Sequence, residues 1–193
     1  MRIVAGCWKG RSLATPKGRD TRPTADRVRE ALFSMLTSHF GTWDDVSVLD
    51  AYAGSGALGI EALSRGASSV VFVERDARAA ELVARNLAHC RVAGGYVMIR
   101  AEFTRALRQL AAGVQFDLAL LDPPYDVADL GAVVDAAAGR MAPGGVMALE
   151  HATRRQAPAR AGRFVAVRQL KAGDSAVTFY REAAAAPAAT EEP

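Results

Sequence analysis

From Val46 onward, the hydrophobic and polar positions of this chain alternate between short apolar runs and longer amphipathic ones. The apolar runs fit strands at residues 46–50, 70–74, 96–100, 116–121 and 146–150. Stretches rich in Ala, Leu and Arg lie between them and fit helices at 58–65, 77–89, 104–111 and 128–141. Such alternation predicts a parallel sheet covered on both faces, and therefore a doubly wound α/β fold. Residues 164–170 and 176–180 are expected to close the sheet as an antiparallel pair.

Residues 1–45 do not continue this alternation, and we interpret them as an extension packed on the main domain at residues 46–182. Residues 2–5 and 11–14, separated by Gly6 and Gly10, fit a hairpin. The following pattern predicts a helix whose apolar face carries Val28, Ala31, Leu32, Met35 and Leu36. Residues 183–193 are rich in alanine and low in complexity, which is typical of a disordered tail.

A glycine-rich turn joins the first expected strand of the main domain to its first expected helix. Gly54, Ser55 and Gly56 form its centre, and residues 54–59 match the dinucleotide-binding fingerprint. A backbone without Cβ atoms can approach a ligand closely. Glu74 follows Gly56 by 18 residues, at the end of the next strand, where a carboxylate receives ribose hydroxyls. The pattern favours a nucleotide-like ligand over a purely structural turn.

Asp50 indicates which class of ligand this turn binds. A pyrophosphate at a helix N-terminus needs N–H groups and positive potential, and a carboxylate four residues before Gly54 would repel it. A ligand with an ammonium and a sulfonium would be attracted, which favours S-adenosylmethionine over a nicotinamide dinucleotide. The alternative is that Asp50 caps a helix or turn. Glu102, after the third strand, is placed to contact the adenine side of the ligand, or else is a surface acid.

A second candidate element, Asp122-Pro123-Pro124-Tyr125, directly follows the apolar run at 116–121. Two prolines end a strand, because proline has no N–H for the ladder and restricts the residue before it. We therefore expect a stiff loop that presents a carboxylate, proline carbonyls and an aromatic ring. Acceptors beside a stacking surface suit a flat molecule with an amino group. The alternative is a rigid turn with a half-buried tyrosine.

The composition fits one soluble enzyme domain: 193 residues, half of them hydrophobic. Cys7 and Cys90 are the only cysteines, and the three histidines show no metal-ligand spacing. We expect free thiols in a reducing compartment and no metal site. No apolar run approaches the roughly 20 residues of a membrane span, and the N-terminus does not resemble a signal peptide. These observations predict a cytoplasmic protein that does not associate with membranes.

The net charge of +3 is unevenly distributed along the chain. Residues 1–30 hold 8 basic and 3 acidic residues, a balance of +5, and residues 151–173 hold 6 basic residues and none acidic. Residues 31–150 hold 9 basic and 14 acidic residues, a balance of −5. Basic segments on both sides of an acidic centre suit a polyanion, because neutralising phosphates releases counterions. The alternative is a set of solvated arginines.

Three motif blocks together resemble a known family. Residues 50–56, followed by Asp122-Pro123-Pro124-Tyr125, resemble the class I S-adenosylmethionine-dependent methyltransferases of amino groups. The second block alone is not specific, since adenine-N6 and glutamine methyltransferases have related loops. Residues 2–6, 9–11 and 21–33 are similar to the RsmD family, which methylates guanine N2 in 16S ribosomal RNA. The resemblance extends over nearly the whole chain up to Tyr180.

This resemblance implies a cofactor, a target and a partner. The cofactor would be S-adenosylmethionine, with Asp50, Tyr52, Gly54, Ser55, Gly56, Glu74 and Glu102 as its contacts. The target amine would lie at Asp122, Pro123, Pro124 and Tyr125. The partner would be 16S ribosomal RNA or the 30S subunit. Nothing in the sequence suggests an obligate dimer, so we expect a monomer. Independently of the resemblance, the basic segments supply candidate phosphate contacts: Arg2, Lys9, Arg11, Arg22 and Arg27, with Arg154, Arg155, Arg160 and Arg163 as a second cluster.

Three other functions remain open on the residues alone. One is methylation of another nucleic-acid amine, adenine N6. Another is a nicotinamide-dependent oxidoreductase, which the glycine fingerprint and Glu74 allow but Asp50 disfavours. The third is a ribosome-assembly protein that binds RNA through its basic segments without catalysis.

Overall fold

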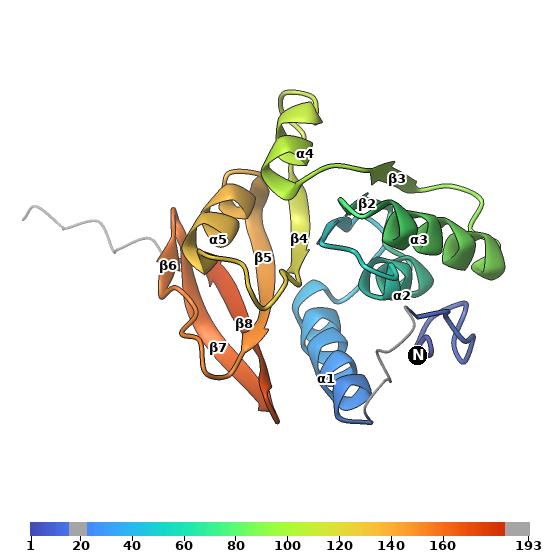
Figure 1. The fold of residues 1–193 in the computed structure, drawn as a ribbon, viewed down its shortest axis with the longest axis horizontal. Coiled ribbons are helices and arrows are strands. Elements are labelled where there is room, and N and C mark those ends of the chain that lie inside the picture. The colour runs from blue at the N-terminus through green and yellow to red at the C-terminus, as the bar shows by residue number, and fades with distance from the viewer. Residues whose placement is uncertain (16–22, 184–193) are drawn as a thin grey trace, which may run out of the picture.

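An eight-stranded mixed sheet forms the centre of the molecule (Figure 1). The computed structural model describes residues 1–15 and 23–183, with side chains from residue 27 onward in the second range. The strands are β1 (Ser47–Ala51), β2 (Ser69–Val73), β3 (Tyr96–Ile99), β4 (Phe116–Leu121), β5 (Met141–Ala152), β6 (Arg160–Ala161), β7 (Phe164–Ala172) and β8 (Ser175–Glu182). Their order is β3-β2-β1-β4-β5-β8-β7-β6. The first five are parallel to one another, as the alternation predicted. The expected antiparallel pair corresponds to β7 and β8, and the short β6 beside them was not expected.

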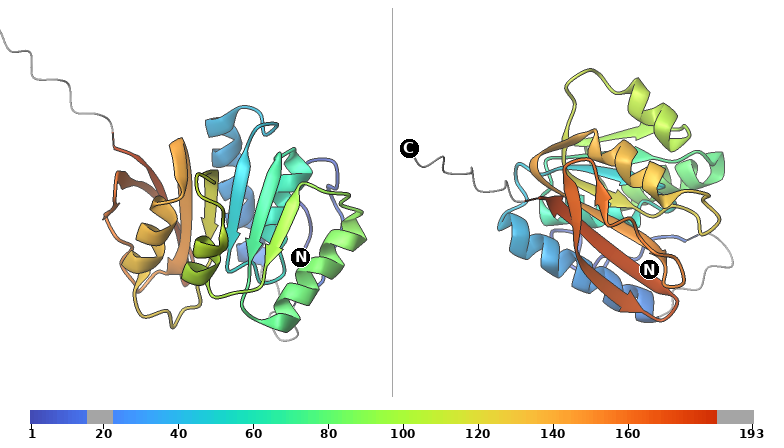
Figure 2. Two further views of the ribbon diagram at one scale, coloured as in Figure 1. Left: turned by 90° about the horizontal axis from the view of Figure 1, so that it is seen from above. Right: turned by 90° about the vertical axis from the view of Figure 1, so that its left-hand side faces the viewer.

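Helices cover both faces of this sheet and enclose two hydrophobic cores. The helices are α1 (Pro23–Phe40), α2 (Ala57–Arg65), α3 (Ala77–Cys90), α4 (Phe103–Gln109) and α5 (Leu130–Ala138). The first three pack against one face, where Phe33, Ile60 and Val83 are fully buried. The last two pack against the other face (Figure 2, right). The doubly wound α/β prediction is therefore confirmed.

The expected element boundaries agree within one or two residues except around α5 and β5. The strand at 116–121 has the expected bounds, whereas the helix expected at 128–141 spans only Leu130–Ala138. It begins late because the Asp129 side chain accepts the N–H groups of Gly131 and Ala132 and caps the first turn. It ends early because Gly139 is its C-cap and Met141 already begins β5, which runs to Ala152.

The hairpin expected from residues 2–5 and 11–14 is present in a shortened form. An isolated antiparallel bridge joins Arg2 and Ser12. Backbone hydrogen bonds beside it run from the Ile3 N–H to the Arg11 carbonyl at 3.0 Å and from the Leu13 N–H to the Met1 carbonyl at 2.9 Å. The expected length of the two strands is wrong, because neither is continuous. In α1 the expected apolar face is also partly wrong, since Ala31 is exposed whereas Phe33 and Arg29 are buried. Arg22 and most of the tail, residues 184–193, lie outside the described residues.

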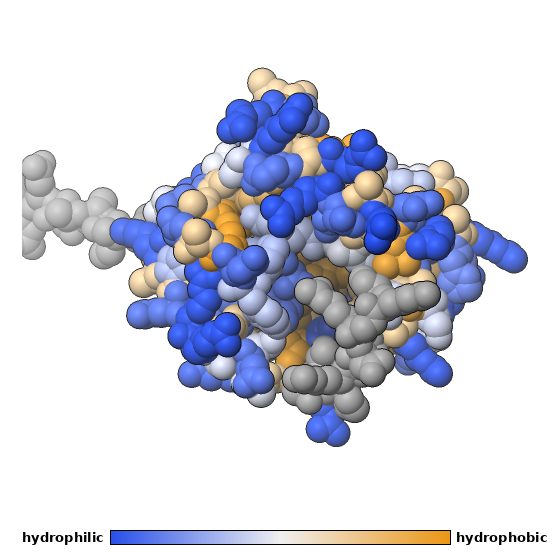
Figure 3. Space-filling view, in the orientation of Figure 1, coloured by the Kyte–Doolittle hydropathy of each residue, from blue (hydrophilic) through white to orange (hydrophobic). Residues whose placement is uncertain are grey.

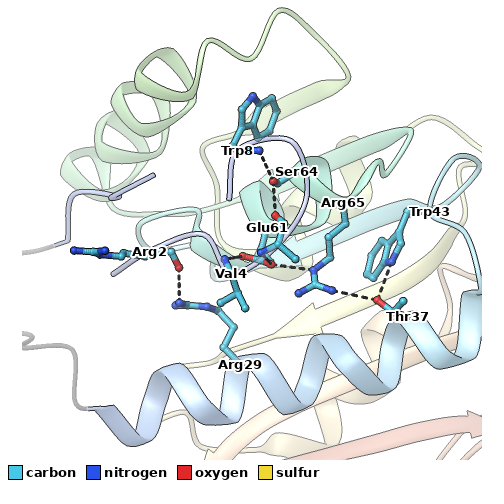
Figure 4. A network of polar contacts seen from close by, with 10 residues as sticks. Arg2, Val4, Trp8, Arg29, Thr37, Trp43, Glu61, Ser64 and Arg65 are labelled. Atoms are coloured by element: carbon cyan, nitrogen blue, oxygen red, sulfur yellow. Dashed lines mark hydrogen bonds and ion pairs between the residues drawn. The ribbon is translucent and has the colours of Figure 1, made fainter. Parts of the chain in front are cut away.

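Two polar side chains of α2 attach the N-terminal loop to the sheet layer (Figure 4). Glu61, which is 1% exposed, accepts the backbone N–H groups of Val4 at 2.7 Å and Ala5 at 3.0 Å. Its carboxylate also pairs with Arg65 at 2.9 Å. Ser64 accepts the Trp8 N–H at 3.0 Å and donates to the Ala5 carbonyl at 2.6 Å. A buried carboxylate with three donors is satisfied, which explains how α2 tolerates a glutamate inside the core.

The surface is predominantly hydrophilic on the face seen in Figure 3, where the apolar residues form small separate patches. Among the described residues, no helix is both long and apolar enough to cross a bilayer. The same residues contain no group of three or more His, Cys, Asp or Glu side chains arranged to hold a metal ion.

Candidate functional site

Three loops meet at the carboxyl ends of the central parallel strands. In the sheet register, Ala51 of β1 lies beside Val73 of β2 and Leu121 of β4. Backbone hydrogen bonds continue past the strands, from Ala53 N–H to the Val73 carbonyl at 2.9 Å and from Asp122 N–H to the Ala51 carbonyl at 3.4 Å. The glycine turn, the residues after β2 and the loop after β4 are therefore neighbours at the edge where doubly wound folds bind ligands.

A cavity of about 200 Å³ opens between these loops. It is lined by Tyr52, Val73, Glu74, Arg75, Ala101, Glu102, Phe103, Pro124, Asp126 and Val127. Four of the predicted site residues are in this lining: Tyr52, Glu74, Glu102 and Pro124. The predicted site residues outside this lining are Asp50 in β1, the turn at residues 54–56, and Asp122, Pro123 and Tyr125 in the loop after β4. The cavity thus combines residues from both predicted motifs.

The glycine turn depends on its glycines for backbone shape and for packing. Gly54 and Gly56 have φ values of +57° and +76°, in the left-handed region that glycine adopts without steric cost. A Cβ on Gly56 would also lie 3.0 Å from a Val83 methyl of α3. Tyr52 adopts a φ of +62° without being glycine, which is an uncommon conformation for an aromatic residue. This conformation places the centroid of the Tyr52 ring 5.2 Å from the centroid of the Phe103 ring, and the two rings form one wall of the cavity.

The third glycine of the fingerprint brings α2 against the sheet. A Cβ on Gly59 would lie 2.3 Å from a ring carbon of Phe72 in β2. The absence of a side chain there lets α2 approach the sheet closely. The Gly59 N–H also donates to the Asp50 carboxylate at 2.8 Å.

Asp50 is buried beneath α2 and is only 1% exposed. Burial raises the pKa of its carboxyl to about 8; the charges of Asp122 and Glu74 act in the same direction, whereas the Gly59 N–H acts to lower it. A direct contact with a ligand in the cavity would require this carboxyl to become exposed. The observed hydrogen bond from the Gly59 N–H, in the first turn of α2, matches the alternative that Asp50 caps a helix. Contact with the cofactor therefore stays a prediction.

Glu74 connects the end of β2 to the glycine turn. One carboxylate oxygen accepts the Gly54 N–H at 2.9 Å and the other accepts the Asp76 N–H at 2.8 Å. These two bonds orient the carboxylate at the cavity wall. Each carboxylate oxygen has a second acceptor position, so the group can still receive hydroxyls from a ligand.

Glu102 is both a cavity residue and the N-cap of α4. Its carboxylate accepts the backbone N–H groups of Thr104 and Arg105, each at 3.1 Å. Partial burial acts to raise the pKa of Glu102, but the bonds from Thr104 and Arg105 outweigh it and lower the pKa below its usual value. The side chain is thus an ionised cap. Phe103, the next residue, was missed by the sequence analysis, and its position directly after Glu102 was the available signal.

The acceptor loop, which we define as residues 122–128, begins where β4 ends at Leu121, directly before the two prolines. Pro123 is buried, Asp122 is half-buried and Tyr125 is 53% exposed. The Pro124 carbonyl belongs to no helix or strand and accepts the Val127 N–H at 3.0 Å in a turn. The Tyr125 hydroxyl lies 3.0 Å from the Ser175 hydroxyl, at the start of β8.

The basic residues expected to contact RNA fall into two groups in the structure: some are exposed, and others donate to carbonyls within the protein. Arg2, Lys9 and Arg27 are exposed. Arg11 is half-buried and donates to the Cys90 carbonyl at 2.8 Å, so its guanidinium stabilises the C-terminal end of α3. One guanidinium nitrogen of Arg11 is thus bonded inside the protein, and phosphate binding by this residue stays a prediction.

The second basic cluster divides in the same way. Arg154 and Arg160 are exposed. Arg163 donates to the Met141 carbonyl at 2.7 Å and pairs with Glu182. Arg155 donates to carbonyls of the acceptor loop. Sequence cannot distinguish a solvated arginine from one whose acceptors are backbone carbonyls in a distant segment.

Comparison with known proteins gives one consistent match. A family model described as "Conserved hypothetical protein 95" matches residues 1–181. The Bacillus subtilis protein named "Putative rRNA methyltransferase YlbH" is 36% identical over 185 residues, which cover 94% of this chain and 99% of that protein. The Escherichia coli "Ribosomal RNA small subunit methyltransferase D" is 38% identical over 125 residues, or 65% of this chain and 60% of that relative's length.

The fold comparison agrees with the sequence comparison. The solved structure titled "Putative methyltransferase yhhF from Escherichia coli" superposes with a TM-score of 0.82 at 32% identity. The match covers 96% of this chain and 99% of that one. Both the parallel half and the antiparallel end of the sheet are therefore shared with that protein.

Proposed function

Because the chain belongs to the family described as conserved hypothetical protein 95, the RsmD family of methyltransferases, we propose that it methylates guanine N2 in ribosomal RNA of the small subunit. The methyl donor is S-adenosylmethionine. One observation carries the proposal: the glycine turn follows β1, the acceptor loop follows β4, and these strands are paired. The methyl donor and the amine that receives the methyl group would therefore meet at the carboxyl ends of β1 and β4.

The residues around the cavity fit this cofactor. The Tyr52 and Phe103 rings supply a flat apolar wall for an adenine, and the oriented Glu74 carboxylate supplies acceptors for ribose hydroxyls. The nearby carboxylates of Glu102, Asp122 and Asp126 create negative potential, which suits the ammonium and sulfonium of S-adenosylmethionine and opposes a pyrophosphate. The same charges disfavour the nicotinamide alternative.

S-adenosylmethionine supplies an activated methyl group, and the acceptor loop supplies the geometry for its transfer. A guanine N2 amine is a weak nucleophile because its lone pair is delocalised into the ring. The Asp122 carboxylate and the Pro123 carbonyl would accept hydrogen bonds from the two N–H groups of this amine and direct its lone pair towards the methyl group. Such acceptors also stabilise the positive charge that develops on nitrogen, by the logic of an oxyanion hole with reversed sign. Tyr125, with its exposed ring, would stack on a flipped base.

The proposed partner is the small ribosomal subunit or its RNA, bound by a monomer in the cytoplasm. The exposed Arg2, Lys9 and Arg27 support phosphate binding on the N-terminal side, and Arg154 and Arg160 support it on the C-terminal side. Such binding should weaken steeply as salt rises, because each neutralised phosphate releases counterions.

Methyl transfer to small subunits from a strain without this protein tests the proposal. Labelled S-adenosylmethionine should deliver one methyl group per subunit, and nuclease mapping should place it on guanine N2. Label on adenine N6 would instead support the alternative target. No transfer to subunits or to free RNA, despite binding of S-adenosylhomocysteine, would contradict the proposed substrate.

A further inference from the structure

We propose that Arg155 is a positioning residue of the acceptor loop and acts through backbone carbonyls inside the protein. This inference deepens the proposed function and rests on it. Arg155 lies between β5 and β6, outside the cavity lining, and 28 residues separate it from Val127 in sequence.

The guanidinium of Arg155 contacts three successive parts of the loop. Its Nη1 donates to the Val127 carbonyl at 2.6 Å and reaches the Tyr125 carbonyl at 3.4 Å. Its Nη2 donates to the Ala128 carbonyl at 3.3 Å. A guanidinium is a rigid plane with five fixed donors, so contacts to several carbonyls at once restrict the position and the orientation of the loop.

A second contact from the same half of the sheet supports this arrangement. The Tyr125 hydroxyl meets Ser175, which pairs with Ala152 of β5 and Ala172 of β7. The loop is therefore held at its backbone by the β5–β6 connection and at its exposed ring by the β7–β8 hairpin. Its other end is fixed by the Asp122 N–H bond to Ala51 of β1.

These contacts bear on catalysis because the restrained residues adjoin the reacting groups. Val127 and Pro124 line the cavity, and Asp122 is the proposed acceptor for the target amine. A displacement of reacting groups by about 1 Å can cost a factor of about 10² in rate. Releasing the loop from Arg155 should therefore lower turnover without removing any group that touches the substrate.

The geometry also separates Arg155 from its neighbours in the basic cluster. Its donors face loop carbonyls, whereas Arg154 and Arg160 are exposed. A phosphate contact depends mainly on charge, and lysine preserves it. A set of three carbonyl contacts depends on the planar fork, and lysine does not reproduce it.

Arg155→Lys and Arg155→Ala test this distinction. We expect both variants to lose about tenfold in kcat on small subunits, while KM and the salt dependence of binding stay as in the parent protein. The matched control is Arg85→Ala, an exposed arginine of α3 at the other end of the sheet, which should leave kcat unchanged. Full recovery by lysine, with a salt slope about one unit shallower in the alanine variant, would identify a phosphate contact and overturn the proposal.

Hydrogen exchange gives a readout that does not depend on activity. The amides of residues 125–128 should exchange faster in Arg155→Ala than in the parent protein, with unchanged exchange in the glycine turn. Unchanged exchange at 125–128, or a kcat loss fully explained by a smaller folded fraction, would overturn the positioning role. If the parent protein methylates no RNA, the proposed function fails, and the exchange result still decides whether Arg155 restrains the loop.

Discussion

The two sides of the candidate site are held in place by different means. On the proposed cofactor side, the glycine turn is fixed from within the parallel half of the sheet, by positive φ angles, by close helix packing and by the Glu74 contact to Gly54. On the acceptor side, the loop is fixed largely by side chains from the antiparallel end, Arg155 and Ser175. A backbone-determined cofactor site tolerates few changes, whereas a loop held by side chains can be adjusted by single substitutions.

This difference predicts that a substitution in the acceptor loop can lower the rate of methyl transfer while the cofactor still binds. Asp122→Ala should lower kcat by a factor of about 10² or more, as expected for the loss of one charge-stabilising contact. S-adenosylhomocysteine should still bind, as measured by calorimetry. Asp135→Ala, which removes an exposed carboxylate of α5, is the control. Near-normal turnover in Asp122→Ala would remove this residue from the mechanism.

The cofactor side should instead fail through packing. Gly59→Ala places a Cβ 2.3 Å from the Phe72 ring, so α2 must shift, and we expect a loss of about 1–3 kcal/mol in the free energy of unfolding. Urea denaturation measures this loss. Gly94→Ala is the control, because no heavy atom beyond its two chain neighbours lies within 4 Å of its added Cβ. Equal stability of the two variants would show that the α2 contact is easily relaxed.

The exposed ring of the acceptor loop should matter mainly for substrate engagement. Tyr125→Ala should weaken binding of RNA by about 1–3 kcal/mol through lost stacking, seen as a higher KM. Tyr125→Phe keeps the ring and loses only the contact to Ser175, so its effect should be smaller. If both variants behave alike, the hydroxyl contact, and not stacking, is the important one.

The smallest expected effect is a pH dependence of cofactor binding that originates in Asp50. A cationic cofactor favours the ionised carboxyl, so binding should lower its pKa from about 8 and release a proton. Affinity should therefore rise between pH 7 and 8 by at most about fivefold, the increase in the ionised fraction of such a group. Calorimetry on the parent protein and on Asp50→Asn measures it, and an identical pH dependence in both would exclude Asp50 as the source.

Much of the fold and the general location of the site could be predicted from the sequence. The alternation of elements is a local property of the chain, so it indicated the parallel strands. The glycines indicated the turn at 54–56, and the two prolines indicated the loop at 122–125, for the same reason. The carboxyl ends of parallel strands share one edge of the sheet, and these two motifs meet there because their parent strands β1 and β4 are paired.

Only the tertiary structure decided how individual polar groups are used. Asp50 is covered by α2 and bonds Gly59, Arg11 stabilises the end of α3, and Arg155 restrains the acceptor loop. The last two contacts join residues 79 and 28 positions apart. A local pattern records the type of a side chain and the face of the element that carries it. Its partners depend on which distant backbone groups the packed elements bring within hydrogen-bonding distance.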